Sequence, residues 1–109
     1  MKRIYISGPM TGLPGLNREA FYQAAKELRA LGFEVSNPAE NDGPGELLSW
    51  EEYMRTDLID MLKCDTIALL PGWEASKGAH LELHVAHRVG MNVVSVAELH
   101  RQELEAMPA

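Results

Sequence analysis

A glutamate on the apolar face of a predicted helix is the first residue of this chain that local packing does not explain. The segment SKGAHLELHVAHRVG predicts a helix closed by Gly90, and at about 100° per residue Glu82 falls on the same face as Ala79 and Ala86. Burying an ionised carboxylate on such a face costs on the order of several kcal/mol unless a partner compensates it. Glu82 is therefore the first functional candidate. The alternative is a side chain that reaches solvent or forms a structural ion pair.

A second carboxylate is placed in the same way in the predicted helix SWEEYMRTDLIDMLK. The apolar stripe of this helix is formed by Trp50, Tyr53, Met54, Leu58 and Met61. Asp57 projects within that stripe, seven residues after Trp50. Two such carboxylates near one edge of a sheet indicate a shared pocket, in which burial tunes an acid/base and a nucleophile. A hydrogen bond from a loop backbone to Asp57 is the structural alternative.

Hydroxyl groups lie where they could serve these carboxylates. Tyr5, in the first predicted strand, could donate a hydrogen bond to a buried carboxylate, or it could simply fill the strand. Ser76 and Gly78 open the helix that carries Glu82. The exposed amides there, with the Ser76 hydroxyl, would suit an anion, whereas an ordinary helix N-cap is the other interpretation.

Trp73 and three histidines need two interpretations each. Trp73 follows a Pro-Gly pair in a loop and could stack on a planar ligand or anchor the loop. His80, His84 and His87 share one helical face, so a metal site must be considered. That face is opposite Glu82 and also carries Arg88, which favours a solvated or subunit-contact face over a metal centre.

The elements that must position these residues alternate between strand and helix. The expected strands are RIYIS, FEVSN, TIALL and NVVSV, and the expected helices span 17–31, 49–63, the Glu82 segment and a polar C-terminal stretch. Asn17 is expected to cap the first helix, Gly32 to end it, and Ser49 with Glu52 to form a capping box. The pattern predicts a doubly wound α/β fold, a flavodoxin/Rossmann-like parallel sheet of about four to five strands with flanking helices.

In such sheets ligands bind beyond the carboxyl ends of the strands, so the loops there are expected to line the site. They are SGPMTGLPG, NPAENDGPG and PGWEASKG, all rich in glycine, proline and small polar residues. The first lacks the spacing of the Walker and dinucleotide motifs. The substrate-binding residues expected from these loops are Ser7, Gly8, Pro9, Met10, Gly12, Asn37, Trp73, Ser76 and Gly78.

Length and composition limit the classes of function. A chain of 109 residues suits a single domain spanning 1–109. Its 16 acidic residues exceed its 10 basic ones, which argues against a nucleic acid polymer or an anionic membrane as partner. No 18-residue apolar run and no leader is visible, and Cys64 is the single cysteine, so a cytoplasmic location is expected.

The chain resembles the nucleoside 2-deoxyribosyltransferase-like superfamily from about residue 3 to 96. The resemblance is carried by IYISGPMTG, NPAE, the Asp57 helix, CDTIALLPGWEAS and SKGAHLELHVA, and it is strongest to a short branch common in phage and prophage genomes. Members of the superfamily cleave the N-glycosidic bond of nucleosides or of nucleoside 5′-monophosphates. The resemblance implies that Glu82 is the nucleophile, that Asp57 assists the departing base and that Tyr5 orients Glu82.

Further details of the resemblance bear on substrate and assembly. Ser76 to Glu82 reads S-x-G-x-x-x-E, which is similar to the nucleoside 5′-monophosphate N-glycosidases and implies a 5′-nucleotide held by Ser76 and the SGPMTG loop, with no metal or cofactor. Relatives close the pocket across a subunit interface, which implies a homodimer or larger homo-oligomer. Trp50, Met54, Met61 and the histidine-bearing face are expected to offer contact surface.

Two other functions stay open at this point. His84 stands where members of the superfamily often have glycine, and the segment after the last strand is short, which would suit a nucleotide-binding or regulatory module without turnover. An NAD-cleaving glycosidase is the other alternative.

Overall fold

The computed structural model describes residues 3–41 and 49–106 and is built around a parallel four-stranded sheet. The strands are β1 (Arg3–Ser7), β2 (Glu34–Ser36), β3 (Thr66–Leu69) and β4 (Asn92–Ser95), arranged in the order β2-β1-β3-β4. Each is short and rich in the β-branched side chains that favour strands. The four expected strands are thus all present.

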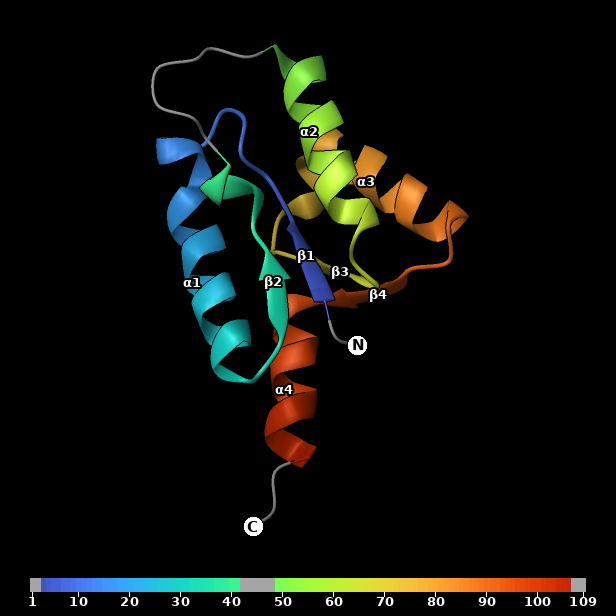
Figure 1. The fold of residues 1–109 in the computed structure, drawn as a ribbon. Helices are drawn as coiled ribbons and strands as arrows, with labels where there is room; N and C mark the ends of the chain where they lie inside the picture. The colour runs from blue at the N-terminus through green and yellow to red at the C-terminus, as the bar shows by residue number, and fades with distance from the viewer. Residues whose placement is uncertain (1–2, 42–48, 107–109) are drawn as a thin grey trace.

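Four helices cover the sheet on both faces (Figure 1). They are α1 (Arg18–Ala30), α2 (Trp50–Leu62), α3 (Lys77–Arg88) and α4 (Val96–Ala106). Helices α1 and α4 pack on one face, and α2 and α3 pack on the other. Short 3-10 turns occupy the connections at Pro14–Asn17, Pro38–Glu40 and Trp73–Ala75. The prediction of a doubly wound α/β fold is confirmed.

The strand order reverses at β1, and this reversal creates the place where a ligand can enter. From β1 the chain crosses to β2 on one side and later to β3 on the other side. The connections that leave the carboxyl ends of β1 and β3 therefore separate toward opposite faces of the sheet. Any site in this fold is expected between the loops that follow these two strands.

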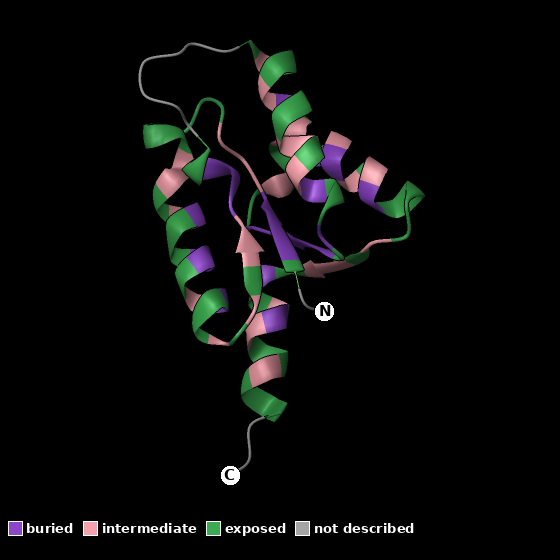
Figure 2. Cartoon of the chain, viewed as in Figure 1, coloured by how far each residue is buried: buried purple, intermediate pink, exposed green. Residues whose placement is uncertain are grey.

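Alternation along β1 sends its side chains into two different cores. Ile4 and Ile6 pack with the core under α1 and α4, whereas Tyr5 packs with Met61 and Ile67 under α2 and α3. Figure 2 shows β1 buried along most of its length. Ser7 has the same parity as Tyr5 and is only 1% exposed, so two hydroxyl groups point from β1 toward α2 and α3.

The helix termini agree with the sequence except at one position. Ser49 and Glu52 form the expected capping box, and Gly32 follows α1 with φ +97°, a conformation that favours glycine. The expectation that Asn17 caps α1 is wrong. Its backbone is left-handed, with φ +59°, and its side-chain amide instead donates to the carbonyl of Pro9 at 2.9 Å. Asn17 therefore fixes the loop that follows β1 rather than the helix end.

Two expected subunit contacts are also wrong. Met61 is fully buried in the core under α2 and α3, and Met54 is 7% exposed, so neither offers a surface to a second subunit. Residues 42–45 of the second expected loop lie outside the described residues. Across the described ranges, no helix has the length and apolar character needed to cross a membrane.

Candidate active site

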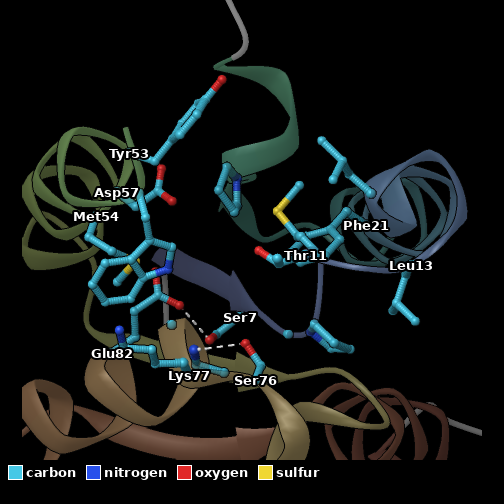
Figure 3. A pocket seen from close by; sticks show the side chains of 18 of the residues that line it. Ser7, Thr11, Leu13, Phe21, Tyr53, Met54, Asp57, Ser76, Lys77 and Glu82 are labelled. Carbon is cyan, nitrogen blue, oxygen red and sulfur yellow. Dashed lines mark hydrogen bonds between the residues drawn. The ribbon is translucent and has the colours of Figure 1, made fainter. Parts of the chain in front are cut away.

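A pocket of about 610 Å³ opens at the carboxyl ends of β1 and β3, between the loops that follow them and helix α2. Figure 3 shows side chains from α2, from the loop after β1 and from the start of α3 turned toward a common space. Most of the expected site residues line it. These are Ser7, Gly8, Pro9, Met10, Asp57, Ser76, Gly78 and Glu82.

Glu82 is held at the inner wall of this pocket by two hydroxyl groups. Its helical phase in α3 turns it toward the sheet, and the residue is 5% exposed. The Tyr5 hydroxyl donates to Oε2 at 2.5 Å, and the Ser7 hydroxyl donates to Oε1 at 2.6 Å. Each carboxyl oxygen thus has a donor from β1, and these hydrogen bonds offset part of the cost of burying the group.

Burial sets the protonation of both Glu82 and Tyr5. Burial raises the pKa of Glu82 to about 7, although the hydrogen bonds from Ser7 and Tyr5 act in the opposite direction. The pKa of Tyr5 is raised well above its usual value, first by burial and then by the nearby carboxylates of Glu82 and Asp57. Tyr5 therefore remains a proton donor in its hydrogen bond, while Glu82 changes its charge near neutral pH.

Helix α2 supplies Asp57 together with an aromatic wall. Trp50, Tyr53 and Asp57 lie at helical spacing on one face and all line the pocket. Asp57 is half-buried, and it is close enough to the Tyr5 hydroxyl for its charge to raise the pKa of that group. The pocket therefore contains a carboxyl group on each of two helices, one deeply buried and one more accessible.

Two glycines allow close approaches around the site. A side chain at Gly8 would place its Cβ 2.7 Å from the Cβ of Leu70, so the loops after β1 and β3 pack directly on one another. A Cβ at Gly78 would lie 3.2 Å from the sulfur of Met54, so α3 begins against α2. The second contact brings the helix of Glu82 close to the helix of Asp57.

Four of the expected residues are not among those that line the pocket. Tyr5 is buried behind Glu82, where it makes the hydrogen bond described above. Asn37 caps the turn at Pro38–Glu40, accepting from the amide of Ala39, and does not reach the pocket. Trp73 packs against the core under α2 and α3 and beside the His80 ring, with centroids 5.3 Å apart, as a loop anchor would. The fourth residue is Gly12, at φ +83° in the loop after β1.

Sequence reasoning did not assign the aromatic and cationic side chains of the pocket, which are Phe21, Trp50, Tyr53 and Lys77. Trp50 and Tyr53 could have been found, because they share the helical stripe of Asp57. Phe21 lies in α1, and nothing local in the sequence indicates that this helix contributes a side chain to the pocket.

The start of α3 contributes the polar residues Ser76 and Lys77 to the pocket lining. The Ser76 hydroxyl accepts from the amide of Ala79 at 3.1 Å and so caps the helix. The Lys77 ammonium lies 4.3 Å from the centre of the Trp50 ring, a cation–π contact at the pocket edge. Among the residues that the structure describes, no group of three histidine, cysteine or acidic side chains could hold a metal ion, and this includes the histidines of α3.

Comparison with known proteins places the chain in a family. A family model described as a domain of unknown function, DUF4406, matches residues 2–95. The chain belongs to this family. The match covers all four strands and helices α1 to α3 of the DUF4406 fold, and therefore every residue of the pocket. Comparison with curated proteins gives no match.

Among solved structures, this DUF4406 chain is similar to a 2-deoxyribosyltransferase from the psychrotolerant bacterium Bacillus psychrosaccharolyticus. The two are 24% identical with a TM-score of 0.67, over 84% of this chain and 70% of that chain. This likeness establishes the shared fold. It agrees with the doubly wound α/β fold that the sequence pattern predicts.

Burial of Glu82 predicts an unusual dependence of stability on pH for the DUF4406 chain. The pKa of Glu82 is raised from 4.5 to about 7, so the folded state holds a proton that the unfolded chain releases. The stabilisation is complete below the unfolded value and is lost as the pH rises through about 7, which amounts to about 3 kcal/mol. Urea unfolding at about pH 5 and about pH 8 measures most of this loss.

Glu82→Gln is the control, since an amide does not titrate and the variant is expected to lack this loss. Glu40 has its pKa lowered by Arg29, so it contributes stability that disappears only as the pH falls, and it is common to both proteins. An equal change in the free energy of unfolding for the two proteins between these pH values would contradict the assignment.

Proposed function

We propose that this chain breaks the N-glycosidic bond of a nucleoside or nucleoside 5′-monophosphate, with Glu82 as the nucleophile. The observation that carries the proposal is the buried carboxyl group of Glu82 in the pocket wall, with one hydroxyl donor on each oxygen. A carboxyl group in this setting is oriented and partly desolvated before a substrate binds, as covalent catalysis requires.

The proposed reaction has two steps. A carboxylate oxygen of Glu82 attacks the anomeric carbon C1′, and the bond from C1′ to the base nitrogen breaks with its electron pair going to the base. Asp57 donates a hydrogen bond or a proton to the departing base. Water or a second base then attacks C1′ and releases Glu82, which gives hydrolysis or transfer respectively.

The lining of the pocket suits a planar base joined to a polar sugar. Trp50 and Tyr53 on one wall and Phe21 on another offer aromatic surface for the base. Hydroxyl, carboxyl and backbone groups gather at the Glu82 end, where the sugar would lie. The volume of about 610 Å³ is within the range of small-molecule sites.

Fold similarity adds support without deciding the reaction. The solved neighbour is a 2-deoxyribosyltransferase, and this chain has a carboxyl pocket at the strand reversal of the same fold. The two chains are 24% identical, and a likeness at this level shows only that they share a fold. Glycosyl transfer is therefore proposed from the chemistry of the pocket.

One experiment tests the proposal directly. The protein is incubated with a panel of nucleosides, nucleoside 5′-monophosphates and NAD, with and without a second free base, and the products are separated by chromatography. Release of free base indicates hydrolysis, and a new nucleoside in the presence of the second base indicates transfer. Binding of nucleotides without either product would instead identify a nucleotide-binding module and overturn the proposal.

A 5′-monophosphate is expected to be preferred over the matching nucleoside. Ser76 and the first amides of α3, beside Lys77, provide donors and positive charge at the pocket entrance. A charge-assisted hydrogen bond contributes about 1.5 to 3 kcal/mol, so Ser76→Ala is expected to reduce the preference for the phosphate about tenfold to a hundredfold. The ratio of kcat/KM for the two substrates measures this preference.

The competing role for Ser76 is helix capping alone. In that case Ser76→Ala loses about 1 kcal/mol of stability, while the ratio of kcat/KM for the 5′-monophosphate and the nucleoside stays constant. Ser49→Ala, which removes the capping hydroxyl of α2 away from the pocket, is the matched control for stability without substrate contact.

A further inference from the structure

Ser7 lines the pocket, as expected of its loop, but its hydroxyl is already bound to another side chain of the protein. Sequence reasoning assigned it to substrate binding, but the residue is 1% exposed and its hydroxyl is 2.6 Å from Oε1 of Glu82. It is the last residue of β1, on the same side of the strand as Tyr5. Its hydroxyl is therefore directed at a carboxyl group before any substrate arrives.

The two hydroxyl groups that bind Glu82 are not equivalent. Tyr5 is fully buried, and it is not among the residues that line the pocket, so the oxygen that it binds, Oε2, is turned toward the core. Ser7 lines the pocket, so the oxygen that it binds, Oε1, is the one on the substrate side. Figure 3 shows the Ser7 hydroxyl beside the Glu82 carboxyl group at the pocket wall.

The side chains also differ in their freedom to move. The Tyr5 ring is packed among Met61, Ile67 and neighbouring residues of the core, so its hydroxyl keeps one position. A serine hydroxyl can turn about its own C–O bond, or about χ1, without disturbing its neighbours. Ser7 can therefore release Oε1 when that oxygen forms a new bond, whereas Tyr5 can hold Oε2 throughout.

From this geometry we infer that Ser7 is a positioning residue, which aims Oε1 of Glu82 into the pocket as the attacking oxygen. The inference rests on the proposed function and names the oxygen that reacts. The bond between Oε1 and C1′ forms while the bond from C1′ to the base nitrogen breaks, the electron pair leaves with the base, and Asp57 supplies the proton that the base takes. The Ser7 hydrogen bond to Oε1 is given up as the ester forms, and the Tyr5 bond to Oε2 remains.

A change in the protonation of Glu82 is the signature that a serine without a hydrogen bond to this carboxyl group would not produce. Removing a donor from a buried carboxylate favours the protonated form, so the Ser7 hydroxyl lowers the pKa of Glu82. Other titratable groups face this region from β1, α2 and α3, and all of them are retained in the variant. They are Tyr5, Tyr53, Asp57, Asp60 and Lys77.

The test is a titration of the Glu82 carboxyl carbon by ¹³C NMR in the wild-type protein, Ser7→Ala, Ser7→Thr and Ser76→Ala. We expect Ser7→Ala to raise the midpoint by about one pH unit, a tenfold change in the acid constant, consistent with the loss of one hydrogen bond to a charged group. Ser7→Thr, which keeps the hydroxyl, is expected to restore the wild-type midpoint. Ser76→Ala removes a pocket hydroxyl that does not contact Glu82 and is expected to leave the midpoint unchanged.

Kinetics then separate positioning from support of the fold. With Ser7→Ala, kcat on a base that leaves without protonation is expected to fall at every pH, because Oε1 is no longer aimed, and to fall about tenfold further below the Glu82 midpoint, with KM unchanged. An unaltered midpoint in Ser7→Ala, or a kcat that returns to the wild-type value above the midpoint, would overturn the inference. If Ser7→Ala does not fold, the midpoint of Ser7→Cys, which keeps the size but is a weak donor, decides in the same way.

The titration needs no turnover, so it also separates the two claims. A shifted midpoint in a protein that releases no base from any substrate overturns the proposed function. It leaves the Ser7 contact to Glu82 established, but it removes the role in attack. An unshifted midpoint in an active protein overturns the Ser7 inference alone.

Discussion

Glu82→Gln is expected to lower the rate of base release by on the order of 10⁴-fold or more, because an amide cannot form the glycosyl ester. The substitution preserves the shape of the side chain: one of the two hydroxyls that bind Glu82 can still donate to the amide oxygen, and the other can turn to accept from the amide nitrogen. Nucleotide affinity is therefore expected to change little, since the lost interaction belongs to the transition state. Single-turnover release of base and equilibrium binding measure the two quantities separately.

Two further measurements support this assignment. Glu74→Gln is the matched control, since Glu74 is an exposed carboxylate in the turn before α3 and is not among the residues that line the pocket. With a base that leaves without protonation, the wild-type rate is also expected to rise with pH through about 7, the pKa of Glu82, and then to level off, because the nucleophile must be ionised. A Glu82→Gln protein with turnover close to wild type would exclude the covalent mechanism.

Asp57→Asn is expected to reduce turnover by about 10²-fold to 10⁴-fold for bases that must be protonated as they leave. An asparagine can still donate a hydrogen bond but cannot transfer a proton. The effect is expected to be much smaller with an N7-methylated purine, because that base departs as a neutral molecule without protonation. The comparison of kcat on the two kinds of substrate is the measurement.

Asp60→Asn provides the control for the Asp57 prediction. Asp60 lies one turn further along α2, where it accepts from the side-chain amide of Asn41, and it is not among the pocket-lining residues. Its substitution is expected to leave both rates near wild type. Equal losses on every substrate for Asp57→Asn would show that Asp57 does not protonate the base.

The fold could be predicted because its determinants are local. β-branched strands, a capping box at Ser49 and Glu52, and the turn at Gly32 each follow from a few neighbouring residues. The position of Glu82 on the buried face of α3 followed from helical period alone. Asn17 was misjudged because its cap role depends on backbone dihedrals that the loop after β1 imposes.

The partners of the predicted site residues could not be read from the sequence in the same way. The contact between Ser7 and Glu82 joins residues 75 positions apart and depends on how α3 docks on β1. The same is true of Trp73, whose ring packs beside His80 and against the core instead of the pocket, although its loop borders the pocket. The periodicity of a sequence predicts on which face of a helix or strand a residue lies. The side chain that it contacts depends on how distant elements pack together.

The contact between Gly78, at the start of α3, and Met54 of α2 limits which substitutions this site can accept during evolution. A methyl group at Gly78 would meet the flexible end of Met54, which must give by a few tenths of an ångström, so stability would record the change only weakly. The two helices carry the two carboxyl groups, however, and proposed catalysis of this kind is sensitive to displacements of that size. Glycine at position 78 therefore sets the distance between the two helices that carry the carboxyl groups. Selection at this position would act through reaction rate before it acts through folding.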